Sequence, residues 1–183
     1  MSVTVVAGVT GVGLTSVCQA VRGKLGENYT LLNFGDVMLE QAATSGITTD
    51  RGELATLSQS QTRRLQRRAG EFVADKAATT NVILSTHLAV ETDAGYLQGL
   101  PEAVLADISP TTFILVEAAP DTIRSRRAAG DGGETASERK IAFEQQLNRS
   151  AALQYAREQT APVQWLENEG GIEQAAERLA NAL

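Results

Sequence analysis

One short segment near the N-terminus constrains this chain more than any other: a β-branched run, closely spaced glycines, and then a helical pattern. Residues 3–7 read Val-Thr-Val-Val-Ala, and glycines follow at positions 8, 11 and 13 before Leu14 and Thr15. This is the layout of the Walker A loop, Gly-x-x-x-x-Gly-Lys-Ser/Thr, with a leucine at the lysine position. The pattern therefore predicts a strand, a phosphate-binding turn and a helix in direct succession.

The predicted turn has the chemistry of an anion site. Glycines let the backbone wrap a phosphate so that successive N–H groups point inward. A helix that starts near Leu14 adds its partial positive charge, and the Thr15 hydroxyl is a candidate Mg²⁺ ligand. The alternative is a glycine-rich turn that binds nothing. The predicted nucleotide-binding residues are Gly8, Val9, Thr10, Gly11, Val12, Gly13, Leu14, Thr15 and Ser16.

The size and cysteine content place the chain in a broad class. Its 183 residues suit a single domain, 1–183, with a core of its own. No apolar stretch approaches the roughly 20 residues of a membrane span. The single cysteine, Cys18, excludes an intrachain disulfide and suits a reducing compartment, so we expect a cytoplasmic protein.

The net charge of the chain indicates which partners it is expected to bind. A net charge of −6 disfavours sequence-independent nucleic-acid binding, so no nucleic-acid partner is expected. Against this background, Arg63, Arg64, Arg67 and Arg68 form a basic stripe at helical spacing. The stripe is interpreted as a solvated or subunit-contacting face, with an RNA or phosphate patch as the alternative.

Strand-like and helical segments alternate along the chain, which predicts an α/β fold with a five-stranded parallel sheet and right-handed crossovers. The expected strands are 3–7, 30–34, 82–85, 112–116 and 163–166. The expected helices are 14–25, 37–43, 53–78, 120–128, 137–159 and 171–183. Ligands of such sheets bind beyond the carboxyl ends of the strands, so the residues that follow each strand are the candidates for a site.

Two insertions interrupt this wound core. The first is a helical region at about 35–79, between the second and third expected strands. The second is a short polar, glycine-rich stretch at about 129–137. Beside a phosphate site, such a connection is expected to act as a mobile lid that expels water; the alternative is a plain solvent loop.

With these pieces in place, the chain resembles the archaeal-type adenylate kinases of the P-loop nucleoside-monophosphate kinase group, nearly from end to end. The glycine loop carries part of this likeness, and Gly95-Tyr96-Leu97-Gln98-Gly99-Leu100-Pro101 is close to the family's Gly-Tyr-Leu-Pro-Gly-Leu-Pro. The other matching motifs are Phe34-Gly35-Asp36-Val37-Met38-Leu39, Asp50-Arg51, Thr86-His87 and Ser125-Arg126.

The resemblance implies a P-loop kinase fold with a helical monophosphate-binding insertion and a short lid. It implies phosphoryl transfer from Mg–ATP to AMP, and a homotrimer. On this basis AMP is expected to meet Gly35, Asp36, Arg51 and His87, and Arg126 and Arg149 are expected to act in catalysis. The alternatives are that Asp36 only caps a helix starting at Val37 and that the two arginines are surface charges.

Three departures from the family pattern leave the function open. Leu14 replaces the loop lysine, Ser85 stands where the family has an aspartate, and no arginine occurs in residues 128–137. Phosphoryl transfer depends on positioning and charge neutralisation, so these are the groups that matter. The open interpretations are an adenylate kinase, a catalytically weakened nucleotide-binding protein, and a kinase for another nucleoside monophosphate.

Overall fold

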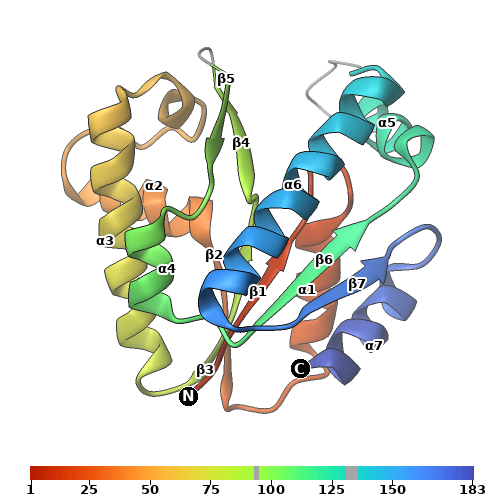
Figure 1. Ribbon diagram of the computed structural model, residues 1–183, viewed down its shortest axis with the longest axis horizontal. Coiled ribbons are helices and arrows are strands. Elements are labelled where there is room, and N and C mark those ends of the chain that lie inside the picture. The colour runs from red at the N-terminus through yellow and green to blue at the C-terminus, as the bar shows by residue number, and fades with distance from the viewer. Residues whose placement is uncertain (93–94, 131–135) are drawn as a thin grey trace.

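A five-stranded parallel sheet forms the centre of the protein (Figure 1). The computed structural model describes residues 1–92, 95–130 and 136–183. The strands are β1 (Val3–Ala7), β2 (Tyr29–Asn33), β3 (Asn81–Thr86), β6 (Thr112–Glu117) and β7 (Val163–Glu167), in the order β2-β3-β1-β6-β7. β1 therefore lies in the middle, and the glycine loop that follows it opens at the centre of the carboxyl edge.

Helices cover both faces of the sheet, so the central strands are buried on both sides. Successive residues of β1 point to opposite layers: Val5 packs in one apolar cluster and Val6 in the other. One cluster holds α2 (Phe34–Thr44), α3 (Gln59–Ala77), α4 (Glu102–Ile108) and most of α6 (Glu138–Gln159). The other holds α1 (Leu14–Arg22), α5 (Pro120–Ala129) and α7 (Ile172–Ala182).

All the expected strands occur, and the α/β prediction is confirmed. The single helix expected over 53–78 is wrong: the structure has a 3-10 helix, η1 (Gly52–Thr56), and then α3. Leu57 between them is extended, with ψ at 148°, and Ser58 starts α3 with a capping box to Gln61. The helical region thus divides where a serine supplies a new helix start.

A β-hairpin and the short helix α4 were not among the predicted elements. The hairpin pairs β4 (Ala89–Thr92) with β5 (Gly95–Gln98) and stands above the carboxyl end of β3 (Figure 1). No residue of these two strands is fully buried, so the sequence has no apolar run that would predict them. At the base of the hairpin, just outside the two strands, the Gly99 N–H donates to the Leu88 carbonyl at 3.0 Å.

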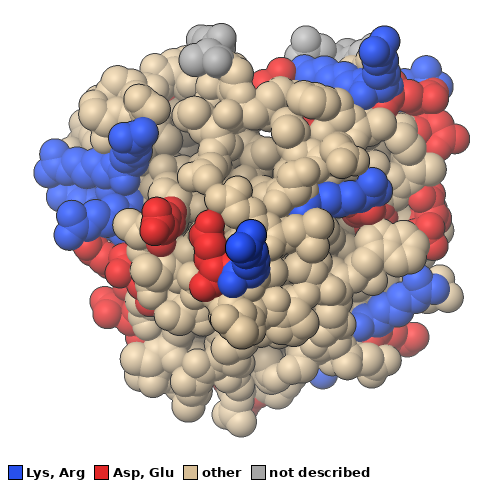
Figure 2. Space-filling view, viewed as in Figure 1, with Lys and Arg blue, Asp and Glu red and all other residues tan. Residues whose placement is uncertain are grey.

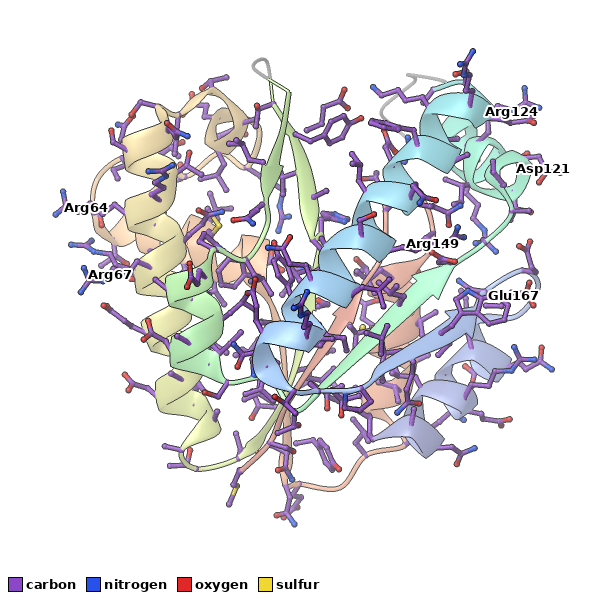
Figure 3. The ribbon with its side chains drawn as sticks, viewed as in Figure 1. Arg64, Arg67, Asp121, Arg124, Arg149 and Glu167 are labelled. Atoms are coloured by element: carbon purple, nitrogen blue, oxygen red, sulfur yellow. The ribbon has the colours of Figure 1, made fainter. Side chains whose placement is uncertain are left out.

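The arginine stripe lies on the outer side of α3. Lys and Arg gather at the left edge of Figure 2, and Arg64 and Arg67 point outward there in Figure 3. Arg67 pairs with Glu71 at 3.1 Å, and Arg68 donates to the Ser45 hydroxyl. Use of this face by a partner stays a prediction. Among the described helices, none is both long and apolar enough to cross a membrane.

Cys18 is expected to resist thiol reagents in the folded protein. It lies on α1 at 2% exposure, and burial raises the pKa of its thiol to about 12. Because the thiolate is the reactive form, the native thiol should stay protonated and unlabelled at pH 8. Labelling followed by mass spectrometry tests this, with the protein in denaturant as the control that takes up one label. Rapid labelling of the native protein would contradict the buried position.

Candidate functional site

The loop after β1 has the backbone geometry of an anion cradle. Gly11 and Gly13 take positive φ values of 82° and 87°, which favour glycine. The Val12 N–H donates to the Val9 carbonyl at 3.2 Å, which tightens the turn. α1 begins at Leu14 with Gly13 as its N-cap and no side-chain cap, so its first N–H groups are left for a ligand.

Side chains from three other segments hold the carbonyl groups of this loop. The Asn168 amide, just after β7, donates to Val12 O at 2.8 Å, and Arg126 of α5 donates to the same oxygen at 3.2 Å. Arg127 Nε donates to Thr10 O at 2.9 Å. His87 Nδ1 lies 2.5 Å from Gly8 O and, because a carbonyl only accepts, must carry the proton there. The loop is therefore held in shape without a ligand.

A cavity of about 990 Å³ runs from this loop to α3. Of the predicted loop residues, Val9, Thr10, Gly11, Gly13, Leu14, Thr15 and Ser16 line it. Gly8 and Val12 do not; the Val12 side chain is fully buried in the core. Gly35, Arg51, His87 and Arg126 also line this cavity, so the structure brings most of the predicted site together.

The far end of the cavity is built by the insertion between β2 and β3. Arg51 forms an ion pair with Asp36 and lies against Gly35, where an added Cβ would come within 3.2 Å of its guanidinium. The proposed capping role of Asp36 is wrong. α2 starts at Phe34, and the Asn33 side chain caps it by accepting from the Asp36 N–H at 3.0 Å. Asp36 instead lies in the first turn, facing Arg51.

Arg149 lies elsewhere. Its guanidinium binds both oxygens of Glu117, at 2.6 and 2.8 Å, and the Trp165 indole donates to the same carboxylate at 2.9 Å. The hydrogen bond to Glu117 raises the pKa of Arg149 above its usual value. Figure 3 shows the side chain beside β6, and it lines neither of the two cavities described here. The expected catalytic role of Arg149 is therefore not supported by this geometry.

A second cavity, of about 680 Å³, adjoins the loop on the side of α5 and α6. Buried charges line it: Arg127 Nη2 donates to Glu144 at 2.6 Å, with side-chain exposures of 12% and 11%. Two polar contacts connect the hairpin to α6, one from Tyr96 OH to Glu144 at 3.4 Å and one from Lys140 to Glu91 at 2.8 Å. Burial, followed by the charges of Glu144 and Glu91, raises the pKa of Tyr96. Gly130 and Ala136, near the two ends of the expected lid at 129–137, line this cavity, and residues 131–135 lie outside the described part of the chain.

Replacing Glu144 with glutamine is expected to lower the free energy of unfolding by about 1.5–3 kcal/mol, the usual worth of a hydrogen bond to a charged group. Glutamine keeps the size but leaves the Arg127 charge without its carboxylate in a largely buried position. Urea unfolding followed by circular dichroism measures the loss. The control is Glu71→Gln, which removes an exposed pair with Arg67 and should change stability little. Equal effects of the two substitutions would contradict the assignment.

Buried side-chain amides position the site, and the sequence analysis missed them. Asn148 accepts from the Leu88 N–H at 3.0 Å and so fixes the turn after His87. Gln145 binds both the N–H and the carbonyl of Ala118, at 3.3 and 3.0 Å. Gln66 of α3 donates to the Gln98 carbonyl at 3.2 Å. A single asparagine or glutamine inside a helix forms no recognisable pattern in the sequence. Burial is what marks such an amide as structurally important, and burial is known only once the fold is known.

The residues available to a metal ion are few. The Thr15 hydroxyl lines the larger cavity, whereas the Ser85 hydroxyl is engaged between Leu32 O and Asn33 Nδ2, both at 3.3 Å. Within the described residues, no aspartate or glutamate lines that cavity and no cluster of metal-binding side chains occurs. Mg²⁺ held here would take Thr15 as its protein ligand, with phosphate oxygens and water as the rest.

The strand order, the glycine loop after the central strand and the helical insertion together define a P-loop kinase fold. Shikimate kinase from Bacteroides thetaiotaomicron shares this fold with a TM-score of 0.64 at 17% identity, covering 99% of this chain and 97% of that chain. A family model described as "AAA domain" matches residues 7–147. The fold of the chain is thus that of the P-loop kinases.

Archaeal relatives give the family. Adenylate kinase from Methanothermobacter thermautotrophicus is 35% identical over 186 residues, covering all of both chains. Adenylate kinase from Thermococcus kodakarensis is 33% identical, covering 99% of this chain and 94% of its own length. The chain belongs to the adenylate kinase family, and this kinship supports a kinase that acts on nucleoside monophosphates.

Proposed function

We propose that the protein transfers a phosphoryl group from ATP to AMP, with Mg²⁺, to give two molecules of ADP. One observation carries this proposal: the glycine loop and the helical insertion face a single cavity, with the loop at one end and Arg51 at the other. A donor triphosphate on the loop and an acceptor monophosphate at Arg51 would then share one cavity, which is the positioning that phosphoryl transfer requires.

Each end of the cavity has a distinct part in this proposal. The N–H groups of the loop and of the first turn of α1 bind the ATP phosphates. Thr15 would hold Mg²⁺, which would supply neutralisation of phosphate charge. Arg51 turns from Asp36 to bind the AMP phosphate through two parallel hydrogen bonds. His87 holds the Gly8 carbonyl through Nδ1 and keeps Nε2 for a substrate. Gly35 lines the cavity beside Arg51, whereas Asp36 pairs with Arg51 without lining the cavity.

The same site favours a second candidate, a nucleotide-binding protein with weakened catalysis. Leu14 provides no charge, and the described cavity has no carboxylate to orient the waters of Mg²⁺. Loss of one preorganised donor typically lowers a rate by about 10²–10³. Binding through the backbone would survive these losses, whereas turnover would fall.

Two measurements on the same preparation test the proposal. A coupled assay follows ADP formation from ATP and AMP, and calorimetry follows binding of ATP, ADP and AMP with and without Mg²⁺. ADP formation that requires AMP supports the kinase. Binding without turnover supports the second candidate, and turnover only with another monophosphate, such as CMP or UMP, assigns a different acceptor. No binding of millimolar nucleotide would refute both candidates.

The family resemblance also supports a homotrimer that works in the cytoplasm. Sedimentation equilibrium of the purified protein tests the subunit number. A monomer at micromolar concentration would refute the trimer and would leave the proposed reaction untouched.

A further inference from the structure

The site has to balance the charge of a triphosphate without the lysine of an ordinary Walker A loop. The Leu14 side chain is buried, with 7% exposure, and lines the cavity as an apolar wall. Arg126 reaches the same place from α5 and lines both cavities. One of its guanidinium nitrogens lies 4.0 Å from the point where a Cβ on Gly13 would be. A cation therefore lies at the start of α1, supplied by another helix.

The other basic side chains near the site are paired with carboxylates. Arg127 binds Glu144, Arg51 binds Asp36 and Lys140 binds Glu91. Farther along α5, Arg124 binds Glu138 at 3.1 Å. Arg126 differs, because its guanidinium donates to backbone carbonyl groups, those of Val12 at 3.2 Å and Asn168 at 2.9 Å, and no described carboxylate pairs with it.

We propose that Arg126 replaces the missing Walker lysine, so that it binds the terminal phosphates of the nucleotide and compensates for Leu14. The inference rests on the proposed nucleotide function and names the source of its positive charge. A guanidinium exchanges carbonyl acceptors for phosphate oxygens readily, since its fork can meet two of them at once. The loop stays in place when Arg126 turns away, because Asn168 still donates to Val12 O at 2.8 Å.

A double-mutant cycle between positions 14 and 126 tests this assignment. Arg126→Gln is expected to weaken ATP binding by about 10–100-fold, the cost of losing a hydrogen-bonded charge. Leu14→Lys is expected to strengthen ATP binding, because a lysine there folds over the loop toward the β- and γ-phosphates. In the Leu14→Lys protein, Arg126→Gln should weaken binding by less than about threefold, because two groups that do the same work are not additive.

Controls separate charge compensation from loop structure. Arg124→Gln removes a neighbouring arginine of the same helix that lines neither cavity, and it should leave ATP affinity unchanged. AMP affinity should not change with Arg126→Gln. Circular dichroism and thermal unfolding of all variants check that the fold persists. If Arg126 only braces the loop, its substitution weakens binding equally with leucine or lysine at position 14.

The outcomes are distinct. Equal factors in the two backgrounds, or no effect of Arg126→Gln in the natural one, would overturn the inference. Non-additive factors without ADP formation would support it while refuting the kinase reaction. If neither the natural protein nor the Leu14→Lys variant binds ATP, the inference and the proposed function fail together.

Discussion

Gly13→Val is expected to weaken ATP binding by at least about 100-fold, so that binding is in practice abolished. The substitution disturbs several hydrogen bonds to charged phosphate at once. Gly13 has a φ of 87°, a conformation that β-branched residues avoid. A Cβ there would lie 2.6 Å from Nδ2 of Asn168, the atom that anchors the loop at Val12. The substitution therefore moves the anchor and the first N–H groups of α1 together. Calorimetric titration with ATP measures the effect.

The matched control for this substitution is Gly26→Val. Gly26 lies between α1 and β2, and an added Cβ there meets no atom within 4 Å. This variant should bind ATP like the unmodified protein. If Gly13→Val also bound ATP with unchanged affinity while remaining folded, the loop could not be the phosphate site.

Gly99→Ala is expected to lower the free energy of unfolding by about 3 kcal/mol or more, at the upper end of overpacking effects. A Cβ on Gly99 would overlap the carbonyl oxygen of His87, and it would lie 2.9 Å from the carbonyl carbon and 3.2 Å from Cα of Leu88. These are backbone atoms, so no side-chain rotation relieves the overlap. The end of β5 would have to move away from the end of β3. Urea unfolding followed by circular dichroism measures the loss.

The consequences of Gly99→Ala should extend to the nucleotide site. His87 belongs to the displaced segment and holds the Gly8 carbonyl through Nδ1. We therefore expect weaker ATP binding in the same variant, measured at a temperature where it remains folded. Gly170→Ala is the control, since a Cβ there meets nothing within 4 Å. A loss of stability no greater than that of the control would show that the two backbones are farther apart than described.

Much of the fold followed from the chain's pattern of apolar residues. Runs such as those of β1 and β6 are buried on both faces, so their β-branched and apolar residues are continuous and easily recognised. The strands β4 and β5 contain no fully buried residue and no such run. The break before α3 depends on one capping box at Ser58, a local signal inside a region of helical composition.

The candidate site was predictable where backbone conformation defines it. Glycine spacing identified the loop because left-handed residues such as Gly11 and Gly13 restrict the choice of side chain. Individual charges were harder to place. Arg126 reaches the loop, but Arg149 binds Glu117, and the sequence gives no sign of which acceptor an arginine meets. The amides of Asn148 and Asn168 bind backbone groups. Because nearly every residue has the same backbone groups, the sequence does not show which of them an amide will bind.

The position of the single tryptophan has a practical consequence for these measurements. Trp165 is 64% exposed on an edge strand, although its indole N–H is bound by Glu117. Its ring is exposed to water both before and after unfolding, so its emission wavelength should shift little when the chain unfolds. The same ring lies beside the Glu117–Arg149 ion pair and should instead respond to changes at that pair. Tryptophan fluorescence is therefore a local optical reporter here, and global unfolding is better followed through the helices.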